Sequence, residues 1–323
     1  MITDFNNSIK LFLTILISID IGTNIILILK KNINKNTNND HKNITQKFID
    51  NFDYVSYENF TITEKMEKNA GWMHMSSNQY YFINGIIRKH KPKNCLEIGI
   101  AEGGSSILIL NAIKDIKDSK LVSLDLKTNF YLNGSYKTGY RVKRYFPELT
   151  KNWKLLTGEQ PHIFLDKLQM KFDFLFLDTA HINPGEIINI IEVLPFLNKN
   201  AIIVVHDIIW HFIKEDESRK IRSISSPNLL LMSVLHGYKK IIEYNNDIDN
   251  MGAIFLYEDQ KKYYLDYFLL LLNFWEYIPS EKQIAELRTF IKKYYVNSLY
   301  SLIFEKAIKN NKNYVDKLKK YIK

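Results

Sequence analysis

Along residues 94–207, short apolar runs alternate with amphipathic segments in a regular rhythm. The apolar runs predict buried strands, because FLFL and IIVV are apolar on both faces, as a sheet covered by helices on both sides requires. A strand–helix–strand order predicts parallel strands joined by right-handed crossovers. A helix is also expected before the first strand, beginning behind a cap at Ser76. The predicted strands are NCLEIGI (94–100), LVSLDL (121–126), WKLLTG (153–158), FDFLFLD (172–178) and AIIVVHD (201–207), and the predicted helices cover 76–91, 105–116, 162–170 and 184–197.

After residue 238 the pattern changes. The runs KKIIEY (239–244) and GAIFLYE (252–258) are separated only by NNDIDNM, which is too short for a crossover helix, so these strands should form an antiparallel hairpin. We therefore predict an α/β fold with a Rossmann-like, doubly wound, mostly parallel seven-stranded sheet and a C-terminal antiparallel hairpin. Helical extensions are expected at both ends, the C-terminal one with helices over 265–278 and 286–309.

Shifts in composition divide the chain into three parts. Residues 1–43 hold an apolar helix and then KKNINKNTNNDHKN (30–43), which has almost no apolar residues and is typical of a linker. Residues 44–260 form the predicted domain around the sheet, and residues 261–323 form the helical C-terminal extension.

The apolar segment at residues 8–29, SIKLFLTILISIDIGTNIILIL, is about long enough to span a bilayer core. Asp20 and Asn24 lie near its centre, and a central Asp costs about 2.5 to 3.5 kcal/mol on insertion scales. Two interpretations stand. The segment contacts a membrane, or it packs as a helix on the domain or on a second subunit of a homo-oligomer. Both place the body of the protein in the cytoplasm. In the first, the N-terminal segment attaches the protein to the inner membrane face, and the lysines that follow it set this orientation.

Composition limits the function classes. The chain has 323 residues and a single cysteine, Cys95, which excludes an internal disulfide framework and cysteine-based zinc sites. The net charge of +9 is compatible with nucleic acid, an anionic membrane face or an acidic substrate, and equally with solvated surface lysines. No basic patch interleaves with aromatic residues in a nucleic-acid-binding motif, so a nucleic-acid partner is not favoured.

The stretch LEIGIAEGGSS (96–106) places a glycine-rich turn directly after the first predicted strand. Its spacing is neither the G-x-G-x-x-G of a dinucleotide fold nor a P-loop, and no lysine is present to neutralise a phosphate. An uncharged or zwitterionic ligand is therefore favoured. The glycines allow a close backbone approach, the next helix offers N–H groups to a carboxylate, and Glu97 can accept from an ammonium group. The alternative is a tight strand-to-helix turn without a ligand.

Asp125 ends the second strand in SLDL. A carboxylate at that point of an α/β sheet typically accepts from both ribose hydroxyls, although an Asp at a strand end is also a common helix cap. Together with the glycine turn, Asp125 indicates a nucleoside that carries an amino-acid moiety and no phosphate. S-adenosylmethionine fits this description.

Four motifs in order, LEIGIAEGGSS, SLDL, FLFLDTAH and IVVHDI, resemble the class I S-adenosylmethionine-dependent methyltransferases. The resemblance covers about residues 70–258 and is nearest to the small-molecule O-methyltransferase branch, which includes macrolide-sugar methyltransferases and cephalosporin-hydroxylase-like proteins. It implies that the methyl donor binds at the glycine turn and that Asp125 holds the ribose. The other residues carried over are Glu97, Gly99, Gly103, Gly104 and Ser105 for the donor, Asp178 and Asp207 as acids, and His181 as a base.

Asp178 and Asp207 close neighbouring strands at the edge where α/β sheets bind ligands, so their carboxylates can hold a divalent ion such as Mg²⁺. A bound cation lowers the pKa of a coordinated hydroxyl, and a neutral His181 can then remove its proton. Metal-dependent relatives often carry a second acid just before the last position, where this chain has His206, and Mg²⁺ prefers oxygen ligands. The alternatives are helix-capping roles for the two acids and a loop role for His181.

The predicted function is transfer of a methyl group to a hydroxyl of a sugar or another small polar acceptor, such as a glycan precursor. Tyr131 and Tyr136, on a long loop after the second strand, are candidate acceptor contacts. One alternative is an RNA methyltransferase, for which an aromatic-proline motif should follow strand four, where DTAHINPGE has Asp and His instead. Another is an inactive methyltransferase-fold scaffold at the membrane, against which the intact donor and acid–base residues argue.

Overall fold

The computed structural model describes residues 75–208, 227–244 and 247–321. The predicted N-terminal helix and linker, residues 1–43, lie outside this set. Among the helices that are described, none is both long and apolar enough to cross a membrane. The sequence predicts that residues 8–29 either contact a membrane or pack on the domain or on a second subunit. Both interpretations therefore stay predictions.

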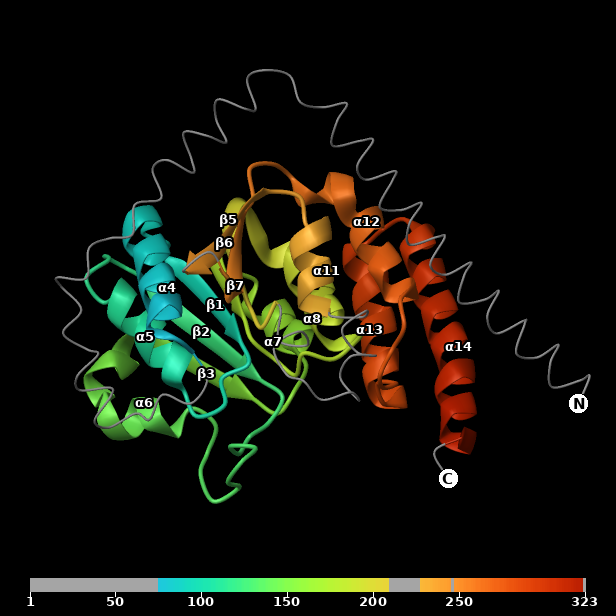
Figure 1. The fold of residues 1–323 in the computed structure, drawn as a ribbon, viewed down its shortest axis with the longest axis horizontal. Coiled ribbons are helices and arrows are strands. Elements are labelled where there is room, and N and C mark those ends of the chain that lie inside the picture. The colour runs from blue at the N-terminus through green and yellow to red at the C-terminus, as the bar shows by residue number, and fades with distance from the viewer. Residues whose placement is uncertain (1–74, 209–226, 245–246, 322–323) are drawn as a thin grey trace, which may run out of the picture. The chain divides into compact units, whose positions relative to one another are not determined.

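Seven strands form one sheet (Figure 1), and their bounds are β1 Asn94–Ile98, β2 Lys120–Asp125, β3 Trp153–Thr157, β4 Phe172–Leu177, β5 Leu197–His206, β6 Tyr238–Tyr244 and β7 Asp247–Phe255. They lie in the order β3-β2-β1-β4-β5-β7-β6. The strands from β3 to β5 pair in parallel, whereas β7 runs antiparallel to both β5 and β6. The order reverses between β1 and β4, which makes this pair the switch point of the sheet. The predicted fold class is confirmed, including the terminal hairpin.

One face of the sheet is covered by α4 (Ser77–His90) and α5 (Gly104–Ile113), which pack against each other, with α6 (Tyr140–Tyr145) beside α5 (Figure 1). The predicted start of α4 is confirmed. The Ser76 side chain accepts from the backbone N–H of Gln79, and the Gln79 side chain accepts from that of Ser76. All residues of α5 but the first are buried, so this helix belongs to the core.

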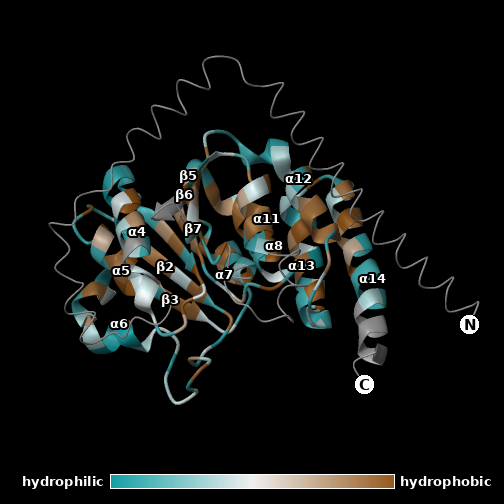
Figure 2. Cartoon of the chain, viewed as in Figure 1, coloured by the Kyte–Doolittle hydropathy of each residue, from teal (hydrophilic) through white to brown (hydrophobic). Residues whose placement is uncertain are grey.

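The other face is covered by α7 (Pro161–Leu168), α8 (Gly185–Val193) and α11 (Pro227–Val234), and both α7 and α11 contact α8 (Figure 1). Hydrophobic residues concentrate on the strands and on the helix sides turned to them (Figure 2). Residues 174–177 of β4 are fully buried, as the run FLFL predicts. Neither α6 nor α11 has a counterpart among the predicted elements.

The sequence predicts a first helix of the C-terminal extension over residues 265–278. This prediction is correct for the first half of the range and wrong for the second half. Helix α12 spans Tyr264–Leu269, and a 3₁₀ turn, Leu270–Leu272, follows it. Residues 273–280, which we call the strap, then continue without helical structure. The strap still buries Trp275, which is 1% exposed, so the apolar pattern continues across the end of the helix and does not reveal it.

The second predicted helix, residues 286–309, is in fact two helices. Helix α13 spans Glu281–Tyr294 and begins with a capping box at Ser280, and α14 spans Ser298–Tyr321. Between them Tyr295 is buried, and its hydroxyl donates to the carbonyl oxygen of a residue in α8. The chain leaves the helical path at the point where it places this tyrosine against the core.

Gly99 sets how closely the loops after β1 and β4 approach each other. Its φ of 86° lies in the left-handed region, and a Cβ atom here would lie 1.7 Å from the carbonyl oxygen of Asp178. A backbone hydrogen bond from Asp178 N to Ile98 O joins the same two segments, and one from Gly99 N to Leu124 O ties the turn to β2, each at 3.0 Å. Only glycine satisfies both the dihedral angle and the available space.

Gly99→Ala should lower the free energy of unfolding by at least about 3 kcal/mol, because the added methyl group meets backbone atoms. Gly104→Ala is the matched control. No heavy atom lies within 4 Å of a Cβ at Gly104, so stability should stay within about 1 kcal/mol of the wild type. Urea unfolding followed by circular dichroism measures both variants. Equal stability of the Gly99→Ala variant and the wild type would contradict this packing.

Candidate functional site

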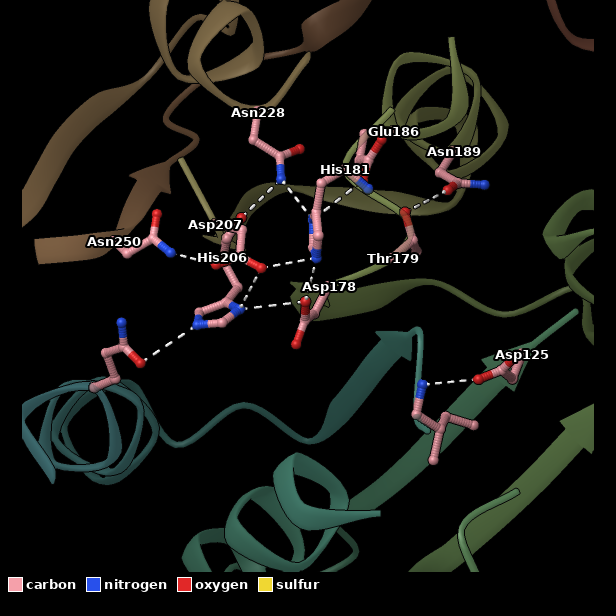
Figure 3. Close-up of polar contacts among 12 residues, drawn as sticks. Asp125, Asp178, Thr179, His181, Glu186, Asn189, His206, Asp207, Asn228 and Asn250 are labelled. Carbon is pink, nitrogen blue, oxygen red and sulfur yellow. Dashed lines mark hydrogen bonds and ion pairs between the residues drawn. The ribbon is translucent and has the colours of Figure 1, made fainter. Parts of the chain in front are cut away.

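Two acids and two histidines meet at the carboxyl ends of β4 and β5 (Figure 3). Asp178 and His181 follow β4, and His206 and Asp207 lie at the end of β5. His181 Nε2 lies 2.8 Å from Asp207 Oδ2 and 3.5 Å from Asp178 Oδ1. His206 Nδ1 lies 3.2 Å from Asp178 Oδ1. The structure thus brings together the three residues predicted for the chemistry and adds His206 to them; we call these four residues the acid–histidine cluster.

Two members of the cluster have unusual backbones. His181 and Asp207 have φ angles of 56° and 55°, in the left-handed region where residues other than glycine are uncommon. Such conformations cost on the order of 1–3 kcal/mol, and they persist where the surroundings hold them, often at functional sites. Here Glu186 accepts from the His181 backbone N–H, and Asn250 O accepts from the N–H that follows Asp207.

His181 is held by two residues that the sequence motifs do not contain. Glu186 of α8 is fully buried, and its Oε1 lies 3.4 Å from His181 Nδ1. Asn228 of α11 is 1% exposed, and its Nδ2 lies 3.3 Å from the same ring nitrogen. The imidazole is therefore fixed through Nδ1, while Nε2 faces the two acids (Figure 3).

The other half of the cluster is held by carboxamides from α4 and β7 (Figure 3). Gln79 Oε1 lies 3.3 Å from His206 Nε2, and Asn250 Nδ2 donates to Asp207 Oδ1. Gln79 and Asn250 come from distant parts of the chain. The tertiary fold brings them to the cluster, Asn250 through the pairing of β7 with β5 and Gln79 through the position of α4 on the sheet. No local motif could have signalled them.

The carboxylates raise the pKa of both histidines. Burial alone would lower the pKa of His181, but Asp207, Glu186 and Asp178 outweigh burial and raise this pKa well above its usual value. Burial also opposes the shift at His206, whose pKa is raised by Asp178 and Asp207. The cluster therefore attracts positive charge, which protons on its histidines or a bound cation can supply.

Asp178, His181 and Asp207 also meet the geometric requirement for a cation site. One ligand atom from each lies within 4.8 Å of the others, and of the residues that are described these three form the group able to hold a metal ion. Two carboxylates and one imidazole fit a divalent cation. The imidazole favours transition metals over Mg²⁺, which prefers oxygen ligands alone.

Of the three glycines in the predicted donor turn, only Gly104 faces open space. A Cβ atom at Gly104 would meet no heavy atom within 4 Å, whereas at Gly103 it would lie 3.0 Å from Val142 Cγ2. Gly103 is the N-cap of α5, with a φ of 103°, and it offers the helix no side-chain acceptor. The amino end of α5 beside Gly104 is therefore the part of the turn that a ligand carboxylate can reach.

Glu97 lies beneath the turn rather than on its surface. It is fully buried, and its two oxygens accept hydrogen bonds from the hydroxyls of Ser105 at 2.5 Å, Ser106 at 2.6 Å and Ser123 at 2.6 Å. Burial raises the pKa of Glu97 to about 7, although the three hydroxyls act in the opposite direction. The structure therefore gives Glu97 and Ser105 a part in fixing the amino end of α5. Their direct contact with a ligand stays a prediction.

Asp125 supports the same turn from the end of β2. Its Oδ2 accepts from the backbone N–H of Ile100 at 2.9 Å (Figure 3) and of Ala101 at 3.3 Å, and its Oδ1 accepts from Lys127 N–H at 2.8 Å. The carboxylate lies beside the glycine turn, and Oδ1, which accepts one of these three hydrogen bonds, has a second lone pair for a ligand hydroxyl. The ribose role of Asp125 also stays a prediction.

Comparison with known families agrees with this arrangement. Residues 96–208 match a family model described as a methyltransferase domain, and this range contains the glycine turn, Asp125 and the whole acid–histidine cluster. A search of curated proteins returned no match. The fold and the family match define a class I methyltransferase domain in this chain, which confirms the resemblance drawn from the four motifs.

Similar solved structures include three methyltransferases. An O-methyltransferase from Bacillus cereus in complex with S-adenosylhomocysteine is 18% identical, over 63% of this chain and 94% of that chain, with a TM-score of 0.44. The O-methyltransferase TomG from Streptomyces achromogenes, involved in tomaymycin synthesis and solved with S-adenosylmethionine, is 14% identical over 65% and 94%, with a TM-score of 0.44. An S-adenosylhomocysteine-bound methyltransferase from Podospora anserina is 17% identical over 68% and 97%, with a TM-score of 0.46. These values record a likeness and carry no information on the acceptor.

The buried carboxyl of Glu97 should make the protein less stable as the pH rises. A carboxyl group whose pKa is higher in the folded than in the unfolded state binds more protons when folded, so stability falls with pH between the two values. For Glu97 this window runs from 4.5 to about 7. The stability of the wild type relative to Glu97→Gln should therefore fall across the window, by about 3 kcal/mol at most. Urea unfolding at several pH values measures it, and a flat difference would contradict the raised pKa.

Proposed function

We propose that this chain transfers a methyl group from S-adenosylmethionine to a hydroxyl of a sugar or another small polar acceptor. The observation that carries the proposal is the position of His181 Nε2, which lies 2.8 Å from Asp207 Oδ2 within a methyltransferase domain. In support, the Asp178 backbone approaches Gly99 closely, so the loop that carries His181 begins beside the glycine turn. Methyl transfer to a hydroxyl requires a base and a bound methyl donor on either side of the acceptor oxygen, so His181 and the glycine turn have to lie close together.

The donor is expected along the amino end of α5. Gly104 leaves space there, and the backbone N–H groups of the first helical turn are suited to the methionine carboxylate. Asp125 is placed to accept from the ribose hydroxyls, and the other residues predicted for the donor shape the turn. S-adenosylmethionine supplies an electrophilic methyl group, whose carbon–sulfur bond breaks as the acceptor oxygen bonds to that carbon.

His181 is the proposed general base. Glu186 and Asn228 orient its ring. Burial lowers the pKa of His181, but Asp207, Glu186 and Asp178 outweigh burial and raise it, so Nε2 first has to lose its proton. A cation on Asp178 and Asp207 would favour this loss, and Nε2 then takes up the proton of the acceptor hydroxyl. A divalent cation held by Asp178 and Asp207 would offset their charges and lower the pKa of a bound hydroxyl. The same two carboxylates also attract the imidazolium that forms after proton transfer.

The sugar assignment draws on the loop after β2. Tyr131 and Tyr136 are 61% and 38% exposed on this loop. Burial raises the pKa of Tyr131, and the charges of Asp178, Glu102 and Asp207 raise it further, so this ring lies within electrostatic reach of the cluster. An exposed aromatic ring beside a polar site is suited to stack on the apolar face of a sugar.

A donor-consumption screen tests the proposed function directly. Release of S-adenosylhomocysteine should depend on the addition of a nucleotide sugar or a glycan fragment. Turnover with RNA alone, or no turnover with any hydroxyl-bearing acceptor, would contradict the proposal.

His181→Asn should lower kcat by about 10²- to 10⁴-fold, because it removes the base. Asparagine also tolerates the left-handed backbone, so the loop conformation is preserved. The Kd for S-adenosylmethionine, measured by calorimetry, should stay within about twofold of the wild-type value. His236→Asn is the matched control, since His236 pairs with Asp266 outside the cluster and its loss should leave kcat unchanged. Donor binding that weakens as much as kcat would contradict the role as base.

Removal of divalent cations should lower kcat by at least about tenfold if Asp178 and Asp207 hold a metal during catalysis. The measurement compares untreated protein, EDTA-treated protein and treated protein supplied again with Mn²⁺, Zn²⁺ or Mg²⁺. Recovery with one of these ions is expected. Full activity after EDTA treatment would contradict the metal assignment and leave the positive charge beside the acids to His181 and His206.

A further inference from the structure

The strap of the C-terminal extension binds the loop that carries His181. Glu276, in the strap, donates its backbone N–H to the carbonyl oxygen of Asn183 at 2.9 Å. The Glu276 side chain completes a second bond, because its Oε2 accepts from the Asn183 backbone N–H at 2.9 Å. Both backbone groups of Asn183 are therefore satisfied by one residue, which lies 93 positions away in the sequence.

Asn183 needs such partners because it is fully buried in a turn between β4 and α8. A buried backbone group without a hydrogen bond costs about 1–3 kcal/mol, so loss of the Glu276 carboxylate would favour a different path for this turn. His181 lies two residues before Asn183 and already has a left-handed backbone. A shift of the turn would therefore also change the position of the His181 backbone and side chain.

The strap itself is fixed by α14. Trp275 is 1% exposed, its backbone N–H donates to Asn311 Oδ1 at 2.8 Å, and its indole N–H donates to Leu271 O at 2.7 Å. Asn311, in α14, also donates to the Asn273 carbonyl at 3.2 Å. Glu276 is thus presented to the loop by a segment whose preceding residues, Asn273 and Trp275, are both bonded to Asn311 of α14.

A second contact joins the strap to the start of α8. The Tyr277 hydroxyl lies 3.4 Å from the position of a Cβ at Gly185, the first residue of that helix. Burial raises the pKa of Tyr277 to about 12, and the charge of Glu186 adds to the effect. Glu186 is the residue that accepts from the His181 backbone N–H, so the strap also lies close to the helix start that supports the loop carrying His181.

We propose that Glu276 is a positioning residue, through which the C-terminal extension holds His181 in its working orientation. Glu276 acts on His181 through the Asn183 backbone. The catalytic consequence rests on the proposed function of His181, whereas the structural consequence does not. The extension is in this view a part of the active site rather than an appendage to the methyltransferase domain.

Variants of Glu276 in the full-length protein test the proposal. Glu276→Ala should lower kcat by at least about tenfold, with Kd for S-adenosylmethionine within about twofold of the wild type. Glu276→Gln keeps an oxygen acceptor for the Asn183 N–H and should retain most of the wild-type kcat. Glu276→Asp keeps the charge but is one methylene shorter, so it should behave like Glu276→Ala. Glu305→Ala is the control in the same extension, because Glu305 forms an exposed pair with Arg288 and its loss should change nothing.

A readout that needs no turnover separates this proposal from the proposed function. In protein with isotope-labelled histidine, the ring signals of His181, assigned with His181→Asn, should shift or broaden in Glu276→Ala and not in Glu305→Ala. If the wild type methylates no acceptor, this comparison still decides whether Glu276 positions His181. Unchanged His181 signals in Glu276→Ala would overturn the proposal, and if this variant does not fold, the same result in Glu276→Asp would do so.

Discussion

The close approach of two backbone loops at the switch point of the sheet is the constraint on which the rest of the structure depends. The loop after β1 passes the loop after β4 so closely that a Cβ at Gly99 would overlap the carbonyl oxygen of Asp178. This contact puts the glycine turn beside the loop that carries Asp178 and His181. The turn predicted to hold the donor and the proposed base are therefore neighbours because of backbone packing, and side chains only refine their positions.

A second constraint is electrostatic. Two carboxylates at the edge of a buried sheet repel each other and lose hydration, so they need compensating charge or hydrogen bonds. The histidines of the cluster supply the charge, with raised pKa values, and Asn250 donates a hydrogen bond to Asp207. Carboxamides from α4 and α11 hold His206 through its ring and its carbonyl oxygen. A site that gathers positive charge in this way is suited to a cation, and it also stabilises a histidine that has just accepted a proton.

The sequence predicted those features that depend on local pattern. Apolar runs on both faces identified the strands, the short spacer identified the hairpin, and strand ends placed Asp178 near Asp207. The sequence pattern could not predict which groups an individual strand side chain contacts. The sequence could not show, for example, that the Glu97 carboxylate accepts hydrogen bonds from three serine hydroxyls, and its predicted ligand contact stays a prediction. Gln79 and Glu276 could not be predicted either, because only the tertiary fold brings them to the site.

The helical extension shows why apolar periodicity overestimates helix length. Trp275 and Tyr295 continue the apolar pattern where the helices have already ended, because each is buried from an irregular segment. Each early helix end creates a tertiary contact. The end of α12 is followed by the strap, which reaches the loop that carries His181, and the end of α13 places Tyr295 against α8.

The central claim is that the open side of the glycine turn holds the methyl donor. Calorimetric titration of S-adenosylmethionine into the wild type and into Gly104→Leu tests it most directly, because the added side chain would enter the space that Gly104 leaves. We predict one binding site in the wild type and a Kd raised at least about tenfold in the variant, with the unfolding midpoint preserved. A wild type that does not bind the donor, or a variant that binds it equally well, would contradict the account.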